Sequence, residues 1–221
     1  MGRPNDEKSE KVGTVVYRYS SPWIYSLESE DHWRLYWQQQ KLMKGEVKSG
    51  QHVLEIGLGS GFTANYLRSK GVRVTTLDID AEKHPDIVAN IVTFDWKDLE
   101  YDHILAFEVF EHIPFVEFSK LMHKIPSVNR GHLFMSVPKS ARVWLHLELR
   151  IPKIVNRTLT LATNRKKITE DHHFWEVGVG PTTYDALKRV FDSSGFRICE
   201  EEIKFSRLFF KLKSPKADRS N

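Results

Sequence analysis

The stretch of sequence that decides the fold is Val53-Leu54-Glu55-Ile56-Gly57-Leu58-Gly59-Ser60-Gly61. It begins as a short apolar run typical of a buried strand, and three glycines then follow at every second position. Glycine is needed where the backbone turns sharply and where a ligand comes close to it. A helical pattern occupies residues 62–70 and ends at Gly71, so the first N–H groups of this helix favour an anion beside the loop. The stretch therefore predicts a strand, a ligand-binding glycine loop and a helix.

On both sides of this loop, short apolar strands alternate with helical segments, which is typical of an α/β sheet. Strands are expected at residues 53–56, 72–77, 90–94, 103–107, 132–137, 196–205 and 207–213. Helices are expected at residues 26–44, 62–70, 115–124 and 182–194. We predict one domain over residues 12–213, with a helical N-terminal cap at about 20–45 and polar tails at 1–11 and 214–221.

The first expected helix carries its large apolar residues on one face, namely Leu27, Trp33, Tyr36, Trp37 and Met43. Such a face is most often part of the core. The alternative is an aromatic cap that closes over a bound ligand and excludes water.

The composition excludes several classes of protein. Hydrophobic residues make up 40% and charged residues 28%, as in ordinary globular domains. No apolar run reaches the ~18–20 residues that span a bilayer, and the polar first residues do not form a secretory signal, so we expect a cytoplasmic protein. The single Cys199 excludes an intrachain disulfide. The net charge of +4 is too small to indicate a nucleic-acid-binding protein, and no RNA-binding module is present.

Acids follow the next two expected strands. Asp78 ends the strand at 72–77, where it is suited to accept hydrogen bonds from ribose hydroxyls, and Asp95 is placed to accept from an adenine amino group. A dinucleotide fingerprint would need glycine at the position of Phe62. A glycine turn without a ligand and a solvated Asp78 is the alternative, which the ordered combination of loop and acids disfavours.

The stretch 55–61, together with Leu77-Asp78-Ile79-Asp80, resembles the signature of class I S-adenosylmethionine-dependent methyltransferases. The resemblance covers residues 53–213 and implies a Rossmann-like α/β fold: a seven-stranded sheet with an antiparallel last strand and helices on both faces. It also implies that S-adenosylmethionine is the cofactor. In that case Gly57 and Gly59 flank the methionine part, Glu55 helps to place its amino group, Asp78 holds the ribose and Asp95 lies near the adenine. The full cofactor-binding set expected is Glu55, Gly57, Gly59, Gly61, Asp78, Ile79, Asp95 and Glu108.

A second group of chemistry-bearing residues follows the fourth expected strand. Glu108, Glu111 and His112 are spaced i, i+3 and i+4, so one helical turn can bring them to a common face. Ligands of α/β sheets bind at the carboxyl ends of the strands. Two carboxylates and an imidazole suit Mg²⁺, Mn²⁺, Fe²⁺ or Zn²⁺. Alternatively, a histidine acts as general base without a metal, or Glu111 and His112 only cap a helix.

The stretch Glu108-Val109-Phe110-Glu111-His112 is similar to the corresponding one in ubiquinone-pathway O-methyltransferases and small-RNA 2′-O-methyltransferases. In the small-RNA enzymes, two Glu, the His and a later His hold a metal, and the segment around the later His resembles Asp171-His172-His173-Phe174. The implied metal ligands are Glu108, Glu111, His112 and His172. Without a metal, His112, His172 or His173 is the candidate general base, and the catalytic residues expected are His112, His172, Glu108 and His173.

This likeness favours O-methylation of a small polar metabolite or sugar. An RNA-directed or lipid-directed methyltransferase and a catalytically silent cofactor-binding subunit are the alternatives, and the sequence does not indicate an oligomeric state.

Residues 139–167 form a long basic insert between the fifth expected strand and the helix at 182–194. It contains eight bases, Lys139, Arg142, Arg150, Lys153, Arg157, Arg165, Lys166 and Lys167, against the single acid Glu148. Apolar residues are interleaved with them. Three interpretations are open: a cationic lid over an anionic small-molecule acceptor, an amphipathic segment on an anionic membrane surface, or a helix pair that packs Trp144, Leu147 and Ile154 onto the core.

Overall fold

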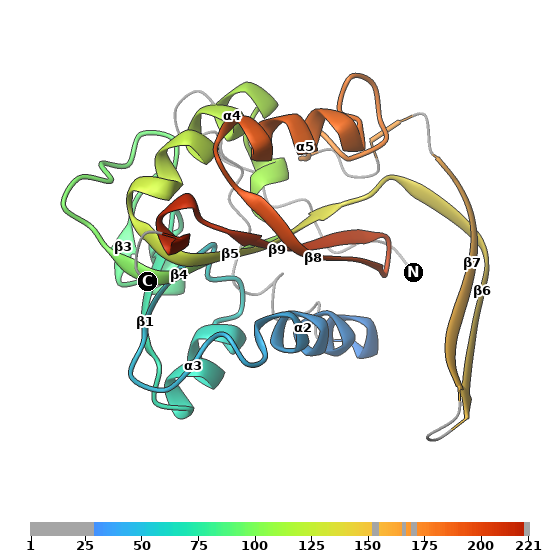
Figure 1. The fold of residues 1–221 in the computed structure, drawn as a ribbon, viewed down its shortest axis with the longest axis horizontal. Coiled ribbons are helices and arrows are strands. Elements are labelled where there is room, and N and C mark those ends of the chain that lie inside the picture. Colours follow the sequence, from blue (N-terminus) through green and yellow to red (C-terminus); the bar gives the residue numbers. More distant parts are fainter. Residues whose placement is uncertain (1–28, 152–154, 165–166, 169–171, 219–221) are drawn as a thin grey trace.

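The computed structural model describes residues 29–151, 155–164, 167–168 and 172–218. The first expected tail and the start of the expected cap, with Leu27, lie outside the described residues, as do Ile154 and Asp171. Figure 1 shows a central sheet covered by helices on both faces, with a separate pair of strands to one side.

Seven strands form the main sheet in the order β3-β2-β1-β4-β5-β9-β8 (Figure 1). They are β1 (His52–Ile56), β2 (Arg73–Asp78), β3 (Ile87–Val88), β4 (Tyr101–Phe107), β5 (Asn129–Pro138), β8 (Arg197–Lys204) and β9 (Arg207–Lys213). The first five are parallel, whereas β9 is antiparallel to both β5 and β8. The expected seven-stranded sheet with an antiparallel last strand is confirmed.

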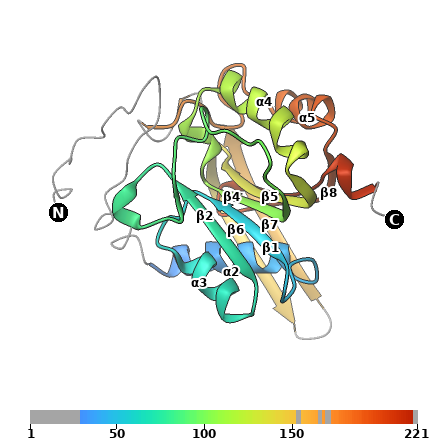
Figure 2. The same ribbon diagram turned by 90° about the vertical axis from the view of Figure 1, so that its left-hand side faces the viewer.

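The helices lie on the two faces of this sheet, as Figure 2 shows. Helices α2 (Glu30–Met43) and α3 (Phe62–Ser69) cover one face, and α4 (Phe115–Lys124) and α5 (Tyr184–Ser193) cover the other. Helix α5 begins where the Thr183 side chain accepts a hydrogen bond from the Ala186 N–H at 3.1 Å. Among the described residues, no helix is long and apolar enough to cross a membrane.

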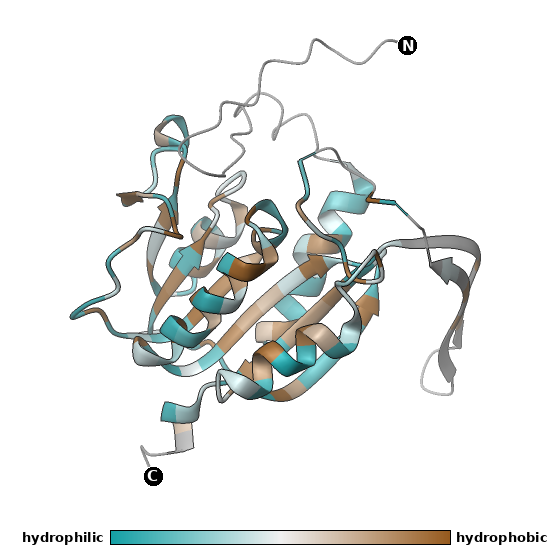
Figure 3. Cartoon of the chain, turned by 90° about the horizontal axis from the view of Figure 1, so that it is seen from above, coloured by the Kyte–Doolittle hydropathy of each residue, from teal (hydrophilic) through white to brown (hydrophobic). Residues whose placement is uncertain are grey.

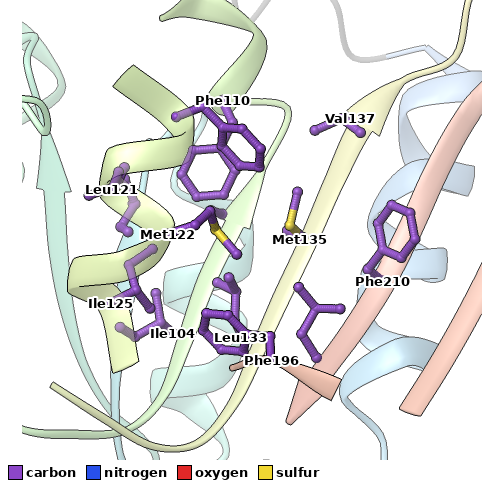
Figure 4. Close-up of a cluster of buried hydrophobic side chains, with 14 of the residues drawn as sticks. Ile104, Phe110, Leu121, Met122, Ile125, Leu133, Met135, Val137, Phe196 and Phe210 are labelled. Atoms are coloured by element: carbon purple, nitrogen blue, oxygen red, sulfur yellow. The ribbon is translucent and has the colours of Figure 1, made fainter. Parts of the chain in front are cut away.

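Two hydrophobic cores follow from the alternation of side chains along the central strands. Ile104 and Leu133 belong to the core under α4 and α5, and their neighbours Leu105 and Phe134 belong to the core under α2 and α3. Figure 4 shows the first core, in which Phe110 and residues of α4 point toward strands β4, β5 and β9. Figure 3 shows the same arrangement from above, with predominantly apolar strands beneath helices of mixed character.

The expected strand at residues 90–94 was wrong. The third strand is β3, where Ile87 and Val88 pair with Leu77 and Asp78. Residues 91–93 instead form a turn, because the side chain of Asn90 accepts a hydrogen bond from the Val92 N–H at 2.9 Å.

The helix-pair interpretation of the basic insert was also wrong. The insert forms two antiparallel strands, β6 (Ala141–Ile151) and β7 (Val155–Asn164), which pair only with each other among the described strands. Leu147, which a helix pair would pack onto the core, is 53% exposed. We call this hairpin the arm; Figure 1 shows it beside the main sheet.

Helix α2 buries a different face from the one expected. Met43 is buried as predicted, together with Leu35, Leu42, Gln38 and Gln39. Trp33 and Trp37 are instead 48% and 69% exposed. The helix begins at a Ser29 cap, whose side chain accepts from the His32 N–H at 3.4 Å.

Candidate functional site

The glycine loop joins β1 to α3 in a backbone conformation that favours glycine. Gly57, Gly59 and Gly61 have φ angles of 78°, 54° and 75°, in the left-handed region. At Gly57 a Cβ atom would lie 2.4 Å from Cγ2 of Val109, so the loop passes directly against the residue that follows Glu108. At Gly59 a Cβ atom would meet nothing within 4 Å. The loop is therefore closely packed at Gly57 and open at Gly59, which leaves one side accessible to a ligand.

Asp78 connects the end of β2 to this loop. Its carboxylate accepts hydrogen bonds from the N–H groups of Leu58 and Asp80, both at 2.8 Å. It also pairs with Nζ of Lys83 at 3.1 Å, and both side chains of this pair are largely buried. Asp78 thus fixes the loop relative to β2 at the carboxyl edge of the sheet.

Glu55 is buried in β1 directly before the loop. Burial raises the pKa of this carboxyl to about 8, against smaller lowering effects of Arg68 and the Ala64 N–H. The side chain is therefore mainly protonated at neutral pH. A cationic ligand group beside it would favour the ionised form.

An aromatic group from α2 lies over the far end of the loop. The hydroxyls of Tyr36 and Ser60 are hydrogen-bonded at 2.8 Å. The ring of Phe62 lies 4.5 Å from that of Tyr36 and 5.0 Å from that of Trp33, measured between centroids. This end of the expected cap therefore contacts the glycine loop.

Of the other expected cofactor residues, Ile79 directly follows Asp78, whereas Asp95 lies in the loop between β3 and β4. Ile79 is half-buried beside Asp78. Asp95 is exposed, and its carboxylate accepts the Lys97 N–H at 3.0 Å.

Glu108 follows β4 with a φ of 55°, an unusual value for a residue other than glycine. Its two carboxylate oxygens are occupied by neighbouring strands: one accepts the Ser136 hydroxyl at 2.7 Å, and the other accepts Nε of Arg207 at 2.6 Å. Glu108 thus ties β4 to β5 and β9. Sequence reasoning missed Ser136 and Arg207, because only the register of β5 with β9 brings them to this position.

The next turn meets a segment about sixty residues further along the chain. Phe110–His112 is a short 3₁₀ helix, and the carbonyl of Glu111 accepts the Phe174 N–H at 2.8 Å. The indole N–H of Trp175 donates to the carbonyl of Ile113 at 3.0 Å. The buried Trp175 ring also packs on the rings of α4. These contacts bring the histidines of residues 172–173 to the end of β4.

Three side chains converge there: Glu111, His112 and His173. One ligand atom of each lies within 4.8 Å of the other two. Glu111 is fully buried, and neither of its carboxylate oxygens has a hydrogen-bond partner among the described residues. We call this group the Glu–His cluster. Buried polar atoms are normally hydrogen-bonded, so an unpartnered carboxylate between two imidazoles indicates a place for a ligand or cation.

The contacts of the two histidines fix where their lone pairs lie. Nδ1 of His112 is 3.3 Å from the carbonyl oxygen of His172, so it carries the proton and donates, which puts the lone pair on Nε2. Nδ1 of His173 is 3.0 Å from Oε1 of the buried Glu176 and donates in the same way. A carboxylate behind an imidazole is the usual arrangement for a metal-ligating or proton-accepting histidine.

Burial shifts the titration of the cluster toward its neutral forms. It lowers the pKa of His112 to about 3, helped by the nearby His173 and Lys83. It also raises the pKa of Glu111, which the charge of Glu108 raises further.

Val109, which lies against Gly57, directly precedes the 3₁₀ helix of Glu111 and His112, and β1 pairs with β4. The glycine loop and the cluster therefore lie at the ends of neighbouring strands.

The cluster differs from the predicted metal set in two members. His173 is in it where His172 was expected; His172 contributes its backbone carbonyl to His112. Glu108 pairs with Arg207 instead of joining the cluster. Glu176, which lies outside the cluster but accepts from Nδ1 of His173, was not singled out from the sequence, although its i+3 spacing from His173 is visible there.

Comparisons with known proteins agree on the fold. A family model described as a methyltransferase domain matches residues 32–201, which is more than half of the chain. None of the curated proteins searched matches this chain.

Solved structures of similar fold include three methyltransferases. A SAM-dependent methyltransferase from Aquifex aeolicus has a TM-score of 0.58 at 14% identity, over 89% of this chain and 100% of its own. Magnesium protoporphyrin IX methyltransferase from Synechocystis PCC 6803, with bound SAM, has a TM-score of 0.52 at 15% identity, over 83% and 79%. The N-methyltransferase NodS from Bradyrhizobium japonicum WM9, in complex with S-adenosyl-L-homocysteine, has a TM-score of 0.54 at 12% identity, over 88% and 98%.

The family match, the strand order with its antiparallel β9 and the glycine loop after β1 agree with one another. The chain belongs to the class I S-adenosylmethionine-dependent methyltransferases.

Proposed function

We propose that this methyltransferase methylates a hydroxyl oxygen of a small polar acceptor, such as a sugar or another polar metabolite, at the Glu–His cluster. The observation that carries the proposal is the buried, unpartnered carboxylate of Glu111 between His112 and His173. It lies at the carboxyl end of β4, which is where α/β sheets bind their ligands. A hydroxyl needs a proton acceptor during methyl transfer, and this group supplies one.

The glycine-loop side fits the cofactor. Gly59 leaves open space and Gly57 brings the loop against Val109. Glu55 would meet the ammonium group of the methionine part, Asp78 the ribose hydroxyls, and Asp95 with Ile79 the adenine. Bound S-adenosylmethionine supplies a methyl group already activated on a sulfonium. The protein therefore has to align the acceptor, exclude water and remove a proton.

The cluster also fits a divalent cation. One carboxylate and two imidazoles are a donor set for Zn²⁺, Fe²⁺ or Mn²⁺, and the unpartnered oxygens of Glu111 favour a cation over an empty site. A cation there would lower the pKa of an acceptor hydroxyl. Glu176 would orient His173 from behind, through the hydrogen bond to its Nδ1.

Without a cation, His112 would act as the base. Its Nδ1–H contact with the His172 carbonyl leaves the lone pair on Nε2, which points away from that carbonyl. The two versions of the site therefore differ in metal dependence while they share the acceptor.

The proposal is tested with the purified protein, methyl-labelled S-adenosylmethionine and a panel of sugars, other small alcohols, RNA and lipids. We expect label on an alcohol oxygen, and loss of turnover in EDTA that Mn²⁺ or Zn²⁺ restores. Label found only on RNA or lipid, or on a nitrogen, would contradict the proposed acceptor. If EDTA leaves turnover intact, the cation version of the site is contradicted and the version with His112 as the base is supported.

A second test concerns the cofactor side alone. Gly59→Ala places a methyl group on the open side of the loop, so we expect affinity for S-adenosylmethionine and S-adenosylhomocysteine to fall at least about tenfold by calorimetry. Gly45→Ala is the matched control, because Gly45 also has a positive φ and nothing within 4 Å but lies outside the loop. Equal affinities of the two variants would show that the cofactor does not occupy the space at Gly59.

A further inference from the structure

The arm carries an exposed apolar face that the proposed function does not use. Five leucines, Leu145, Leu147, Leu149, Leu159 and Leu161, are each between 39% and 57% exposed. The register of β6 with β7 pairs Leu145 with Leu161 and Leu147 with Leu159. Directly paired residues of antiparallel strands lie on the same face, and so do alternate residues of one strand. The five leucines therefore form one continuous patch, which we call the leucine face.

The residues that alternate with these leucines in the sequence are polar or charged. They are His146, Glu148 and Arg150 in β6, and Thr158 and Thr160 in β7. A two-stranded ribbon with one apolar and one polar set of positions is amphipathic. Exposed contiguous apolar surface on such an element indicates a contact with another molecule rather than with water.

The charge of the insert indicates which kind of molecule the leucine face contacts. Residues 139–167 contain eight bases and one acid, and the register places Arg157 opposite Leu149 and Arg150 opposite Asn156, next to the end of the leucine face. An anionic surface attracts this positive charge, which strengthens binding. A second copy of the chain would bring two equally basic arms together, which costs electrostatic energy.

The position of the arm relates this face to the site. The arm leaves the sheet after β5, where Ser140 donates its N–H to the carbonyl of Val177 at 2.9 Å and its hydroxyl to the carbonyl of Lys167 at 3.4 Å. Val177 directly follows Glu176, the partner of His173. The arm is therefore anchored at the sheet edge that carries the Glu–His cluster.

We propose that the leucine face of the arm docks the protein on an anionic phospholipid bilayer. The leucines enter the interfacial region, and the net positive charge of the insert attracts the anionic lipid surface. Docking holds the edge of the sheet with the candidate site near the bilayer. The inference does not rest on the proposed acceptor, because it concerns surface binding and not the reaction.

Vesicle flotation of the full chain tests the proposal directly. We expect binding to vesicles that contain phosphatidylglycerol, at least about tenfold weaker binding to pure phosphatidylcholine, and release at high salt. Leu147→Thr combined with Leu159→Thr should weaken binding at least about tenfold, since it removes a central leucine pair while threonine keeps a high strand propensity. Arg150→Glu combined with Arg157→Glu should do the same while it leaves every leucine in place.

The control is Val116→Thr combined with Ile203→Thr, which changes two residues of similar exposure, 59% and 50%, on the main domain. It should bind vesicles as the unchanged protein does. Affinity for S-adenosylmethionine, measured for every variant, verifies folding. Absence of binding to anionic vesicles, or binding that the leucine variant retains, would overturn the proposal. So would a dimer in sedimentation equilibrium that the leucine variant dissociates, because the face would then belong to a second copy.

Discussion

Glu111→Met is expected to reduce methyl transfer at least about a hundredfold and, at the same time, to make the protein more stable. Activity falls because the variant lacks the carboxylate of the Glu–His cluster. Stability rises by about 1–3 kcal/mol, because methionine has a similar shape and needs no partner for the two buried oxygens that Glu111 leaves without one. Turnover is measured on the acceptor found in the panel, and stability by urea denaturation.

The matched control is Glu117→Met in the first turn of α4, whose carboxylate forms a partly exposed pair with Lys120. Its stability should change by no more than about 0.5 kcal/mol, with unchanged turnover. A less stable Glu111→Met protein would contradict the argument from the unpartnered carboxylate. Unchanged turnover would contradict the role of Glu111 in the site.

Gly57→Ala should be among the most destabilising single changes in the chain. The new Cβ lies 2.4 Å from Cγ2 of Val109, and φ is 78°. Overpacking costs about 1–3 kcal/mol and the left-handed backbone about 1 kcal/mol more. We therefore expect a loss of about 2–4 kcal/mol in urea denaturation, together with loss of cofactor binding.

Two companion variants separate these causes. Gly45→Ala has the same backbone strain, at a φ of 86°, without a nearby atom, so it should cost only about 1 kcal/mol. Val109→Ala, added to Gly57→Ala, removes the clashing methyl group and should recover part of the lost stability. If Gly57→Ala cost no more than Gly45→Ala, or if Val109→Ala restored nothing, the close packing of the loop against Val109 would be disproved.

Much of the fold was predictable because its signals are local. The glycine loop, the periodicity of α4 and the alternation of strands with helices all depend on residues close together in sequence. The prediction of a strand at residues 90–94 was wrong for an equally local reason. The hydrogen bond from the Val92 N–H to the side chain of Asn90 holds the chain in a turn, so the β-branched residues that follow Asn90 do not form a strand. The two strands of the arm were not predicted, because the segment with the leucines at 145, 147 and 149 was interpreted as helical. The period of two of these leucines is that of a strand.

The site was predictable only in part, because its second half is distant in sequence. Glu111 and His112 could be predicted as site residues because they come just after the end of β4. Which of the two adjacent histidines reaches them depends on the Phe174 N–H contact with the Glu111 carbonyl, which no spacing reveals. Arg207 lies 99 residues after Glu108 in the sequence, and its hydrogen bond to the Glu108 carboxylate keeps that side chain out of the cluster.

The two ends of the arm lie next to each other, joined by the contact of Ser140 with Lys167. An insertion whose two ends lie next to each other does not constrain the strands that flank it. Its length and composition can therefore change while the sheet keeps its structure. Under the proposed docking, membrane binding and the candidate site therefore belong to separate parts of the chain. A change in the arm would alter membrane binding while the residues of the Glu–His cluster stay the same.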